Sequence, residues 1–319
     1  MKKNKPVILV TGVCGDIGSS AVYALNDFPS VLIGTDVQQI TPVRGKLGAF
    51  YTIPGAQNVD QYIQSMLEIV ERKKVLFLLP ISEPEIVVIS AHRAIFERLG
   101  VRLLINNEMV VENFLDKLKT SRFLEKLGVE VPKSVSLAEF DGNWDFPVIV
   151  KSKRGCGSKR LWVAEREDID YLRRKDEGDL IVQELVGSAE EEFTTGVFSD
   201  GDRVSSITFR RKLGYGGLSK EVVLADVPYL AELSRKIARA VKLVGAINIQ
   251  SRKHGGNYLP FEINPRLSST LLFRKKFGFD DVVWWVKVLS GESYSYQPIY
   301  RAGKALRCCA EYYYDLESV

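Results

Sequence analysis

The first thirty-six residues contain the pattern that most constrains the fold of this chain. An apolar run begins at Val7 and stops at Gly12, a glycine-rich turn and a helical stretch follow, and a second apolar run ends at Asp36. This order predicts a strand, a turn, a helix and a second, parallel strand. We therefore expect the chain to open with an α/β unit.

A second unit of the same kind follows. A helical pattern covers residues 62–73, an apolar strand reaches Pro80, and a predicted helix at 86–100 leads to a short strand at 101–105. The two units predict a doubly wound α/β domain over the first hundred or so residues. Start signals after Asn106 then predict a pair of helices.

The rest of the chain has a different pattern. From Pro147 onward, short strand-like runs alternate with glycine-rich turns, and an amphipathic helix near residues 229–245 precedes two strands at 246–252 and 258–264. A His-Gly-Gly-Asn turn joins those strands. The pattern predicts antiparallel sheets with helices on one side. The expected fold class is α/β, with an α+β C-terminal part.

Composition excludes several classes of function. With 45% hydrophobic residues and interspersed charges that sum to +4, the chain suits a globular protein without a basic stripe for nucleic acid. No apolar stretch approaches the roughly eighteen residues of a membrane span. The cysteines have neither disulfide-framework nor zinc spacing, and a reducing cytoplasm is the predicted location; they are Cys14, Cys156, Cys308 and Cys309.

The glycine-rich turn at residues 11–18 has two interpretations. Asp36 lies at the spacing that would reach a ribose hydroxyl, which is typical of dinucleotide binding. Tyr171 and Lys175 match the Tyr-x-x-x-Lys pattern of reductases, but they lie in a highly charged stretch far in sequence from the glycine-rich turn. A lone turn of this kind also serves packing. An NAD(P)-dependent epimerase or reductase therefore remains an alternative.

A basic loop is the second candidate site. Lys151 ends an apolar run, and residues 150–160 contain five cationic side chains with two glycines. Glycines let backbone N–H groups approach phosphate oxygens, while lysines neutralise their charge. The loop lacks the Walker A pattern. Its composition indicates a polyphosphate clamp, with a basic surface hairpin as the alternative.

Oxygen ligands converge in the third candidate. Glu262 and Asn264 are two residues apart and share one face of a strand, where Gln250 on the partner strand can join them. Mg²⁺ prefers such oxygen donors when phosphates supply its remaining ligands. Arg266 follows and could stabilise a transferring phosphoryl group. An ordinary polar hairpin edge is the alternative.

The three pieces, in this order, resemble the ATP-grasp superfamily, most closely its carbamoyl-phosphate synthase large-chain-like branch. The stretch at 262–270 is the most specific part of a resemblance that covers nearly the whole chain. It implies an ATP-grasp fold with an N-terminal Rossmann-like pre-grasp domain at 1–106. Subdomain A, with the linker helices and a small Gly-Ser lid, would cover 107–186, and subdomain B, with the metal site and C-terminal segment, 187–319.

The resemblance also implies roles for individual residues. Arg266 and Lys151 would be catalytic, Gln250, Glu262 and Asn264 would bind metal, and Glu192 would hold the ribose. A phosphate-binding set and an adenine-binding set would complete the site; they are Lys117, Lys151, Lys153, Gly155, Gly157 and Ser158, and Gln183, Glu184, Leu185 and Val186. Extra acidic residues leave open the choice between Gln183 and Glu184, and between Glu190 and Glu192.

The implied activity is an ATP-dependent carboxylate-amine (or thiol) ligase. It would form an acyl phosphate on an amino acid or other small acid, with ATP and Mg²⁺ (or Mn²⁺) as cofactors and release of ADP and phosphate. The implied partners are small carboxylates and amines, with no nucleic acid or membrane, and a homodimer is allowed. The acceptor is expected near residues 210–219, whose cations suit an anionic substrate. A non-catalytic ATP-binding protein is a further alternative.

Overall fold

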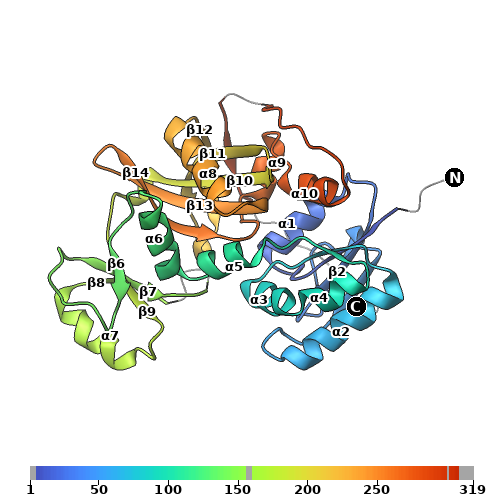
Figure 1. Cartoon of the computed structure of the whole chain (residues 1–319), viewed down its shortest axis with the longest axis horizontal. Helices are drawn as coiled ribbons and strands as arrows, with labels where there is room; N and C mark the ends of the chain where they lie inside the picture. Colours follow the sequence, from blue (N-terminus) through green and yellow to red (C-terminus); the bar gives the residue numbers. More distant parts are fainter. Residues whose placement is uncertain (1–4, 156–159, 300–301, 309–319) are drawn as a thin grey trace.

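A computed structural model describes residues 5–155, 160–299 and 302–308 of the chain. It contains three separate β-sheets, each with its own helices (Figure 1). The predictions made for Cys156, Gly157, Ser158 and Cys309 lie outside the described residues.

The first sheet is parallel, with the strand order β3-β2-β1-β4-β5. Both of its faces are covered, because Ile8 and Val10 enter one hydrophobic core while Leu9 enters another. Its strands are β1 (Val7–Val10), β2 (Val31–Asp36), β3 (Ala49–Thr52), β4 (Phe77–Leu79) and β5 (Arg102–Leu103). Its helices are α1 (Asp16–Leu25), η1 (Arg44–Lys46), α2 (Val59–Lys73), α3 (Glu83–Ala91) and α4 (Arg93–Arg98).

Two local predictions in this region need correction. The single helix expected at 86–100 is two helices, because His92 leaves helical backbone angles between α3 and α4. Strand β3 was not predicted, since its apolar run is only three residues long and none of its four residues is buried.

The second sheet is small and antiparallel, with the order β6-β9-β7-β8. The predicted helix pair, α5 (Glu108–Phe114) and α6 (Lys117–Lys126), leads into it. Its strands are β6 (Ser134–Ser136), β7 (Val148–Ser152), β8 (Leu161–Ala164) and β9 (Leu180–Glu184). Leu172 of α7 (Ile169–Lys175), which follows η2 (Arg166–Asp168), packs into its core.

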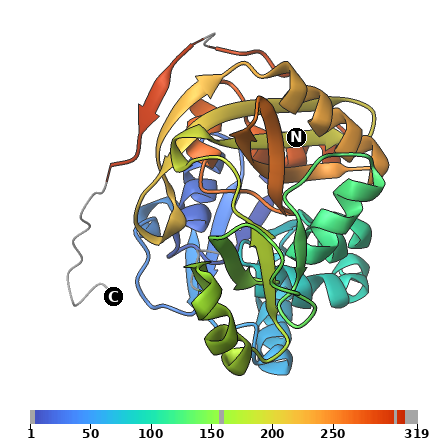
Figure 2. The same ribbon diagram turned by 90° about the vertical axis from the view of Figure 1, so that its left-hand side faces the viewer.

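The third sheet is antiparallel and has the order β14-β13-β10-β11-β12-β15. Figure 2 shows β15 at its outer edge. The strands are β10 (Glu192–Asp200), β11 (Val204–Leu213), β12 (Ser219–Ala225), β13 (Val244–His254), β14 (Asn257–Asn264) and β15 (Lys304–Leu306). The helices are η3 (Ala189–Glu191), η4 (Tyr215–Gly217), α8 (Pro228–Ala240), α9 (Leu271–Lys276) and α10 (Asp281–Leu289).

Helices cover this large sheet on both faces. Leu230, Leu233 and Ile237 of α8 recur on one side of the helix and pack with Ile247 and Ile249 of β13. Helices α9 and α10 cover the opposite face. Because strand side chains alternate, successive residues of β11 and β13 point to these two different faces.

The expected helix near 229–245 is shorter than its pattern suggested. It ends at Ala240, because Lys242 adopts a left-handed conformation (φ 49°) and the Leu243 N–H bonds back to the Ala238 carbonyl. The hairpin between β13 and β14 is confirmed. Gly255 and Gly256 both have positive φ, as a two-residue turn between such strands requires.

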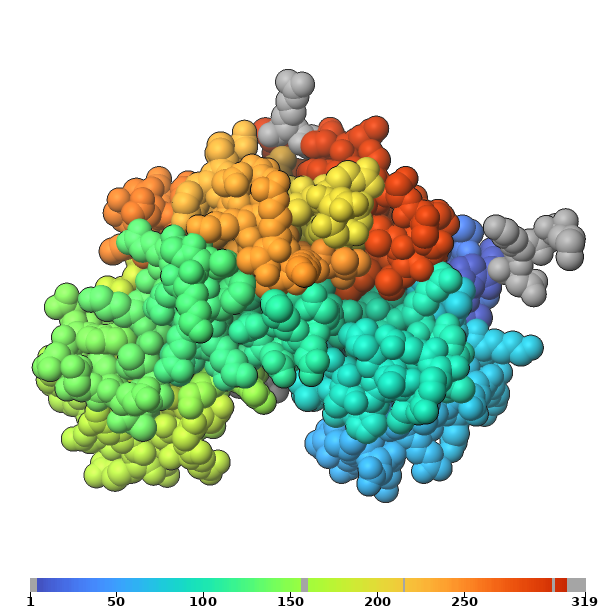
Figure 3. All heavy atoms as spheres, in the orientation of Figure 1, coloured from blue at the N-terminus to red at the C-terminus, as the bar shows by residue number. Residues whose placement is uncertain are grey.

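The buried side chain of Asn106, which follows the last strand of the first sheet, forms hydrogen bonds to the large sheet and to the loop after it. The Asn106 amide donates to the carbonyl oxygens of Ala246 and Pro265 at 2.8 and 2.9 Å. In a space-filling view, the lobe of the small sheet and the lobe of the first sheet enclose a notch below the large sheet (Figure 3). Within the described ranges no helix combines the length and the hydropathy that a membrane span requires.

Candidate active site

Lys117 is placed by the start of α6. The Asp116 side chain accepts the N–H groups of Leu118 and Lys119 at 3.0 and 3.1 Å, so it caps the helix and leaves Lys117 in the first turn. The Lys117 ammonium donates to the Gly155 carbonyl oxygen at 2.8 Å. The structure therefore joins two members of the predicted phosphate-binding set, 38 positions apart.

Lys151 lies at the C-terminal end of the apolar run of β7 and is only 5% exposed. Its ammonium donates to Oε1 of Gln183 at 2.7 Å, and the Gln183 amide donates to Ser134 at 2.9 Å. Burial is the main reason that the pKa of Lys151 falls to about 8; in that balance Glu262 and Glu192 raise the pKa, and the nearby cations Lys117 and Arg252 lower it. At neutral pH the side chain is a buried cation with one neutral partner.

The oxygen-ligand hairpin places Gln250 beside Glu262 across the strand pair. Gln250 of β13 pairs directly with Glu262 of β14, and Asn248 pairs with Asn264. A register shift after Gln250 places Phe261 as an extra residue next to this pair. The Lys151 ammonium lies 5.5 Å from the centre of the Phe261 ring. That contact joins the small sheet directly to the large one.

Glu262 lies near cationic side chains that come from several separate elements of the structure. Burial raises the pKa of this carboxyl, but the charges of Lys117, Lys151, Arg266 and Arg211 outweigh burial and hold the pKa below its usual range. These four cations come from α6, β7, the loop after β14, and β11. The basic loop region and the Glu/Asn strand therefore face one another.

Arg266 is held by the first lobe of the protein. Its guanidinium donates to the Glu83 carboxylate at 2.9 Å, and both side chains are largely buried. Glu83 is the first residue of α3, next to a Ser82–Glu85 capping box that fixes this helix start. Asn106 holds the neighbouring Pro265. Two residues of the first lobe thus set the position of the predicted catalytic arginine.

Two further arginines contribute to the site: Arg252, which sequence reasoning missed, and Arg211, which it included only as part of the predicted acceptor segment 210–219. Arg211 donates to Oε1 of Glu192 and to Oε1 of Gln250, each at 2.7 Å, and Arg252 donates to Oε2 of Glu192 at 3.0 Å. The signal for Arg252 was available, because it lies two residues after Gln250 on the same strand face. Both oxygens of Glu192, the predicted ribose ligand, are therefore bonded to arginines.

The metal set fits a magnesium ion in its donor chemistry. Glu262 stays ionised because of its lowered pKa, and Asn264 offers an amide oxygen on the same strand face. The Gln250 oxygen already accepts the Arg211 hydrogen bond, so it would have to be released to bind a metal. In the described part of the chain, no three His, Cys, Asp or Glu side chains form a metal-binding group.

The nucleoside-binding alternatives are separated by the structure. Gln183 faces Lys151, whereas the Glu184 carboxylate accepts the Lys133 backbone N–H at 3.3 Å. Leu185 and Val186 follow β9 in the segment that connects the small sheet to the large one. Glu190 is exposed, unlike the buried Glu192. Between Gln183 and Glu184, and between Glu190 and Glu192, the structure therefore places Gln183 and Glu192 next to the cationic side chains of the site.

In the glycine-rich turn, polar groups that could bind a ligand are already hydrogen-bonded within the protein. The Asp36 carboxylate accepts the backbone N–H groups of Cys14 and Gln38 at 2.8 and 3.0 Å. A Cβ on Gly18 would lie 2.1 Å from the Gly12 carbonyl oxygen, so this glycine permits close packing of α1 on the turn. These contacts support the packing interpretation of the turn.

The reductase alternative also fails on placement. Tyr171 lies on α7, where it is 55% exposed, and α7 belongs to the small sheet at the opposite end of Figure 1 from α1. A Tyr-Lys pair would have to lie beside the nicotinamide, and hence beside the turn that opens α1.

Comparison with known proteins agrees with this geometry. The family described as "ATP-grasp in the biosynthetic pathway with Ter operon" matches residues 176–308. The carbamoyl phosphate synthase large chain of Pyrococcus furiosus is 26% identical over 202 residues, which are 56% of this chain and 19% of that protein. The same protein from Clostridium acetobutylicum is 22% identical over 260 residues, 73% of this chain and 24% of that protein. The chain thus spans about a fifth to a quarter of these relatives.

Solved structures share the fold. A Campylobacter jejuni biotin carboxylase–ATP complex superposes with a TM-score of 0.73 at 17% identity, covering 91% of this chain and 72% of that one. The ADP complex of the Staphylococcus aureus N5-carboxyaminoimidazole synthetase gives 0.72 at 13% identity, covering 92% and 79%. Residues 176–308 thus match an ATP-grasp family model, and the chain is similar in sequence to carbamoyl phosphate synthase large chains and in fold to biotin carboxylase and N5-carboxyaminoimidazole synthetase.

Proposed function

We propose that this protein is an ATP-dependent ligase that activates a small carboxylate, such as that of an amino acid, as an acyl phosphate. An amine or a thiol then displaces phosphate to give an amide or a thioester. The observation that carries the proposal is the convergence on Glu262 of four cations from separate elements. Such a group of charges around one carboxylate suits a metal-bound triphosphate.

The charge balance supports a polyanionic ligand. Five cations gather around three carboxylates, which leaves an excess of two positive charges in a partly buried place. The cations are Lys117, Lys151, Arg211, Arg252 and Arg266, and the carboxylates are Glu83, Glu192 and Glu262. Burying such an excess costs free energy unless an anion neutralises it.

In the proposed reaction the chain's own residues position ATP and neutralise the negative charge of its phosphates. Lys117 and Lys151 would bind the phosphate oxygens of ATP, and Arg266 would stabilise the charge on the phosphoryl group in transfer. The carboxylate oxygen attacks the γ-phosphorus and the bond to the bridging oxygen of ADP breaks. Glu262 and Asn264 would hold Mg²⁺, which supplies further neutralisation of the phosphates when bound.

Only part of the predicted acceptor segment faces this site. Arg211 points toward Glu192 and Gln250, whereas strand alternation directs Arg210 and Lys212 to the other face of the sheet. We therefore place the acceptor acid near Arg211. The division into domains at 1–106, 107–186 and 187–319, cytoplasmic residence and a homodimer remain proposals.

The test is an ADP-release screen of the full chain with Mg·ATP, using amino acids and other small acids with and without amines. We expect ADP release that requires one acid and increases with one nucleophile. Tight binding of Mg·ATP without ADP release under any pairing would favour a non-catalytic nucleotide-binding protein. Absence of Mg·ATP binding would contradict the proposal.

A further inference from the structure

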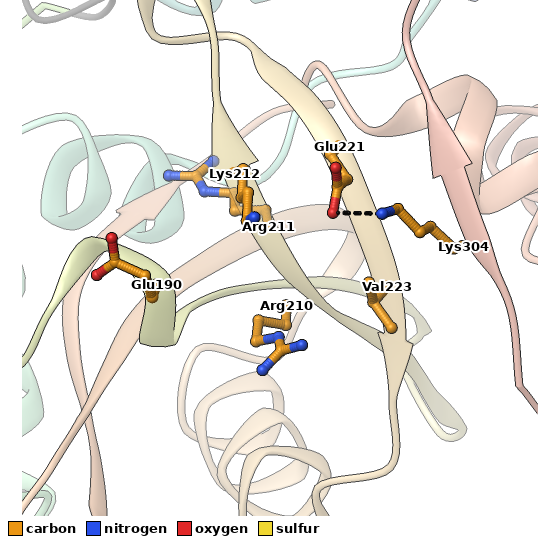
Figure 4. Close-up of a pocket in the computed structure, with 7 residues that line it drawn as sticks. All are labelled: Glu190, Arg210, Arg211, Lys212, Glu221, Val223 and Lys304. Atoms are coloured by element: carbon orange, nitrogen blue, oxygen red, sulfur yellow. Dashed lines mark ion pairs between the residues drawn. The ribbon is translucent and has the colours of Figure 1, made fainter.

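The structure contains a cavity on the large sheet that the proposed reaction does not use. It has a volume of about 380 Å³, within the range of small-molecule sites. Figure 4 shows the residues that line it, which are Glu190, Arg210, Arg211, Lys212, Glu221, Val223 and Lys304. We call it the outer cavity.

The outer cavity lies on the opposite face of the sheet from Glu262. Arg210 of β11 pairs with Val223 of β12, and Lys212 pairs with Glu221. Val223 in turn pairs with Lys304 of β15. Directly opposite residues share a sheet face, while Arg211 between them points to the other one. In Figure 4 the guanidinium groups of Arg210 and Arg211 accordingly point in different directions.

The lining of the outer cavity is charged and predominantly cationic. Lys304 forms an ion pair with Glu221 at 2.9 Å. Within the described residues, the side chains of Arg210 and Lys212 make no hydrogen bond or ion pair. The Lys304 hydrogen bond, and to a smaller extent the charges of Lys212 and Arg210, lower the pKa of Glu221. Val223 is the only apolar lining residue. A guanidinium and an ammonium thus remain available to a ligand.

We propose that the outer cavity binds a small polyanion, a molecule with two or more carboxylate or phosphate groups. Arg210 offers a planar pair of donors to one anionic group, and Lys212 offers a point charge to a second. Glu190 and Glu221, which also line the cavity, would repel a ligand that presents carboxylates on every side. Arg210 and Lys212 point to the other face of the sheet from the catalytic cluster, and Arg211 of the same strand, β11, borders both sites.

The experiment is calorimetric titration of the full chain, without magnesium, with citrate and separately with pyrophosphate. Arg210→Ala/Lys212→Ala should weaken binding of the preferred probe at least tenfold. Because pyrophosphate can also bind the catalytic cluster, both probes are titrated into Lys117→Met/Lys151→Met as well. The binding component that is weakened in Arg210→Ala/Lys212→Ala should keep its affinity within twofold in that variant. Arg98→Ala/Lys126→Ala removes one arginine and one lysine from exposed helical positions elsewhere, and it should also change little.

The two probes distinguish the source of the anionic groups, since citrate carries carboxylates and pyrophosphate carries phosphates. Undiminished binding to Arg210→Ala/Lys212→Ala, with its unfolding temperature unchanged, would overturn the proposal. Loss of the same binding component in Lys117→Met/Lys151→Met would do the same, because it would assign the anion to the catalytic cluster. Failure of both probes to bind the wild-type chain at millimolar concentration would also refute it. Lys304→Ala, which leaves β11 intact, should weaken binding less than the double variant.

Discussion

Two regions of this protein have compositions typical of nucleotide binding, and they differ in how far their polar groups are already satisfied. In the turn at residues 11–18, Asp36 accepts two backbone N–H groups and Gly18 packs against a carbonyl oxygen. Around Glu262, by contrast, separate elements bring together more positive than negative charge. Glycine content alone therefore does not identify a binding site, whereas a residual charge that only a ligand can balance does.

The largest expected effect comes from removing the charge at the centre of the cluster. Glu262→Gln keeps an oxygen ligand but removes the carboxylate, so the rate of ADP release should fall by about 10²–10³-fold. The circular dichroism spectrum should stay that of the folded protein. Glu232→Gln, on the exposed side of α8, is the matched control and should retain activity. Full activity in Glu262→Gln would remove this residue from the site.

In the glycine-rich turn we expect a substitution to lower stability rather than nucleotide binding. Gly18→Ala would place a Cβ 2.1 Å from the Gly12 carbonyl oxygen, so the free energy of unfolding should fall by about 1–3 kcal/mol or more. Chemical denaturation measures this loss. Gly45→Ala has open space around the new Cβ and should change stability far less. If Gly18→Ala instead kept its stability and lost affinity for ATP, the turn would be a binding site.

Removing the ion pair that holds Arg266 should lower activity less than the change at Glu262. Glu83→Gln removes the charged partner of its guanidinium, so kcat should fall about tenfold while KM for ATP changes little. A purely structural role for Glu83 would lower the unfolding temperature without this separation of kcat from KM. Glu83→Ala, which also removes the oxygen acceptor, should lose more activity than Glu83→Gln.

The smallest effect concerns pH. Burial lowers the pKa of Lys151 to about 8, so this side chain is cationic below that pH and loses its proton as the pH rises through it. Mg·ATP should therefore bind more weakly above pH 8, by up to about tenfold per pH unit until the pKa of the complex is reached. Lys151→Met should bind ATP weakly with no such pH step. A wild-type affinity that is constant from pH 7 to 9.5 would contradict the role assigned to this lysine.

Local rules were sufficient for much of the site. Glu262 and Asn264 share a face by strand alternation, which could be predicted. The pairing of Gln250 with Glu262 does not follow from the turn alone, because the register set by the two-residue turn would place Gln250 opposite Phe261, and the register shift after Gln250 brings it opposite Glu262. The role of Asp116 as a helix cap, which places Lys117, is also a local effect.

Contacts between distant segments could not be predicted in the same way. Arg266 and Glu83 are 183 positions apart, and no pattern in either segment indicates the other. The same holds for Arg211, whose direction differs from that of Arg210 and Lys212 only once β11 has been placed in the sheet. Strand β15 was missed because three partly exposed residues at the sheet edge carry no periodic signal.

A crystal structure of the chain with Mg²⁺ and a non-hydrolysable ATP analogue would show whether the nucleotide binds at the Glu262 cluster. We expect the metal at about 2.0–2.1 Å from oxygens of Glu262 and Asn264, with the phosphates between it and the ammonium groups of Lys117 and Lys151. A nucleotide bound instead at the turn of residues 11–18, with no phosphate near Lys151, would contradict this expectation.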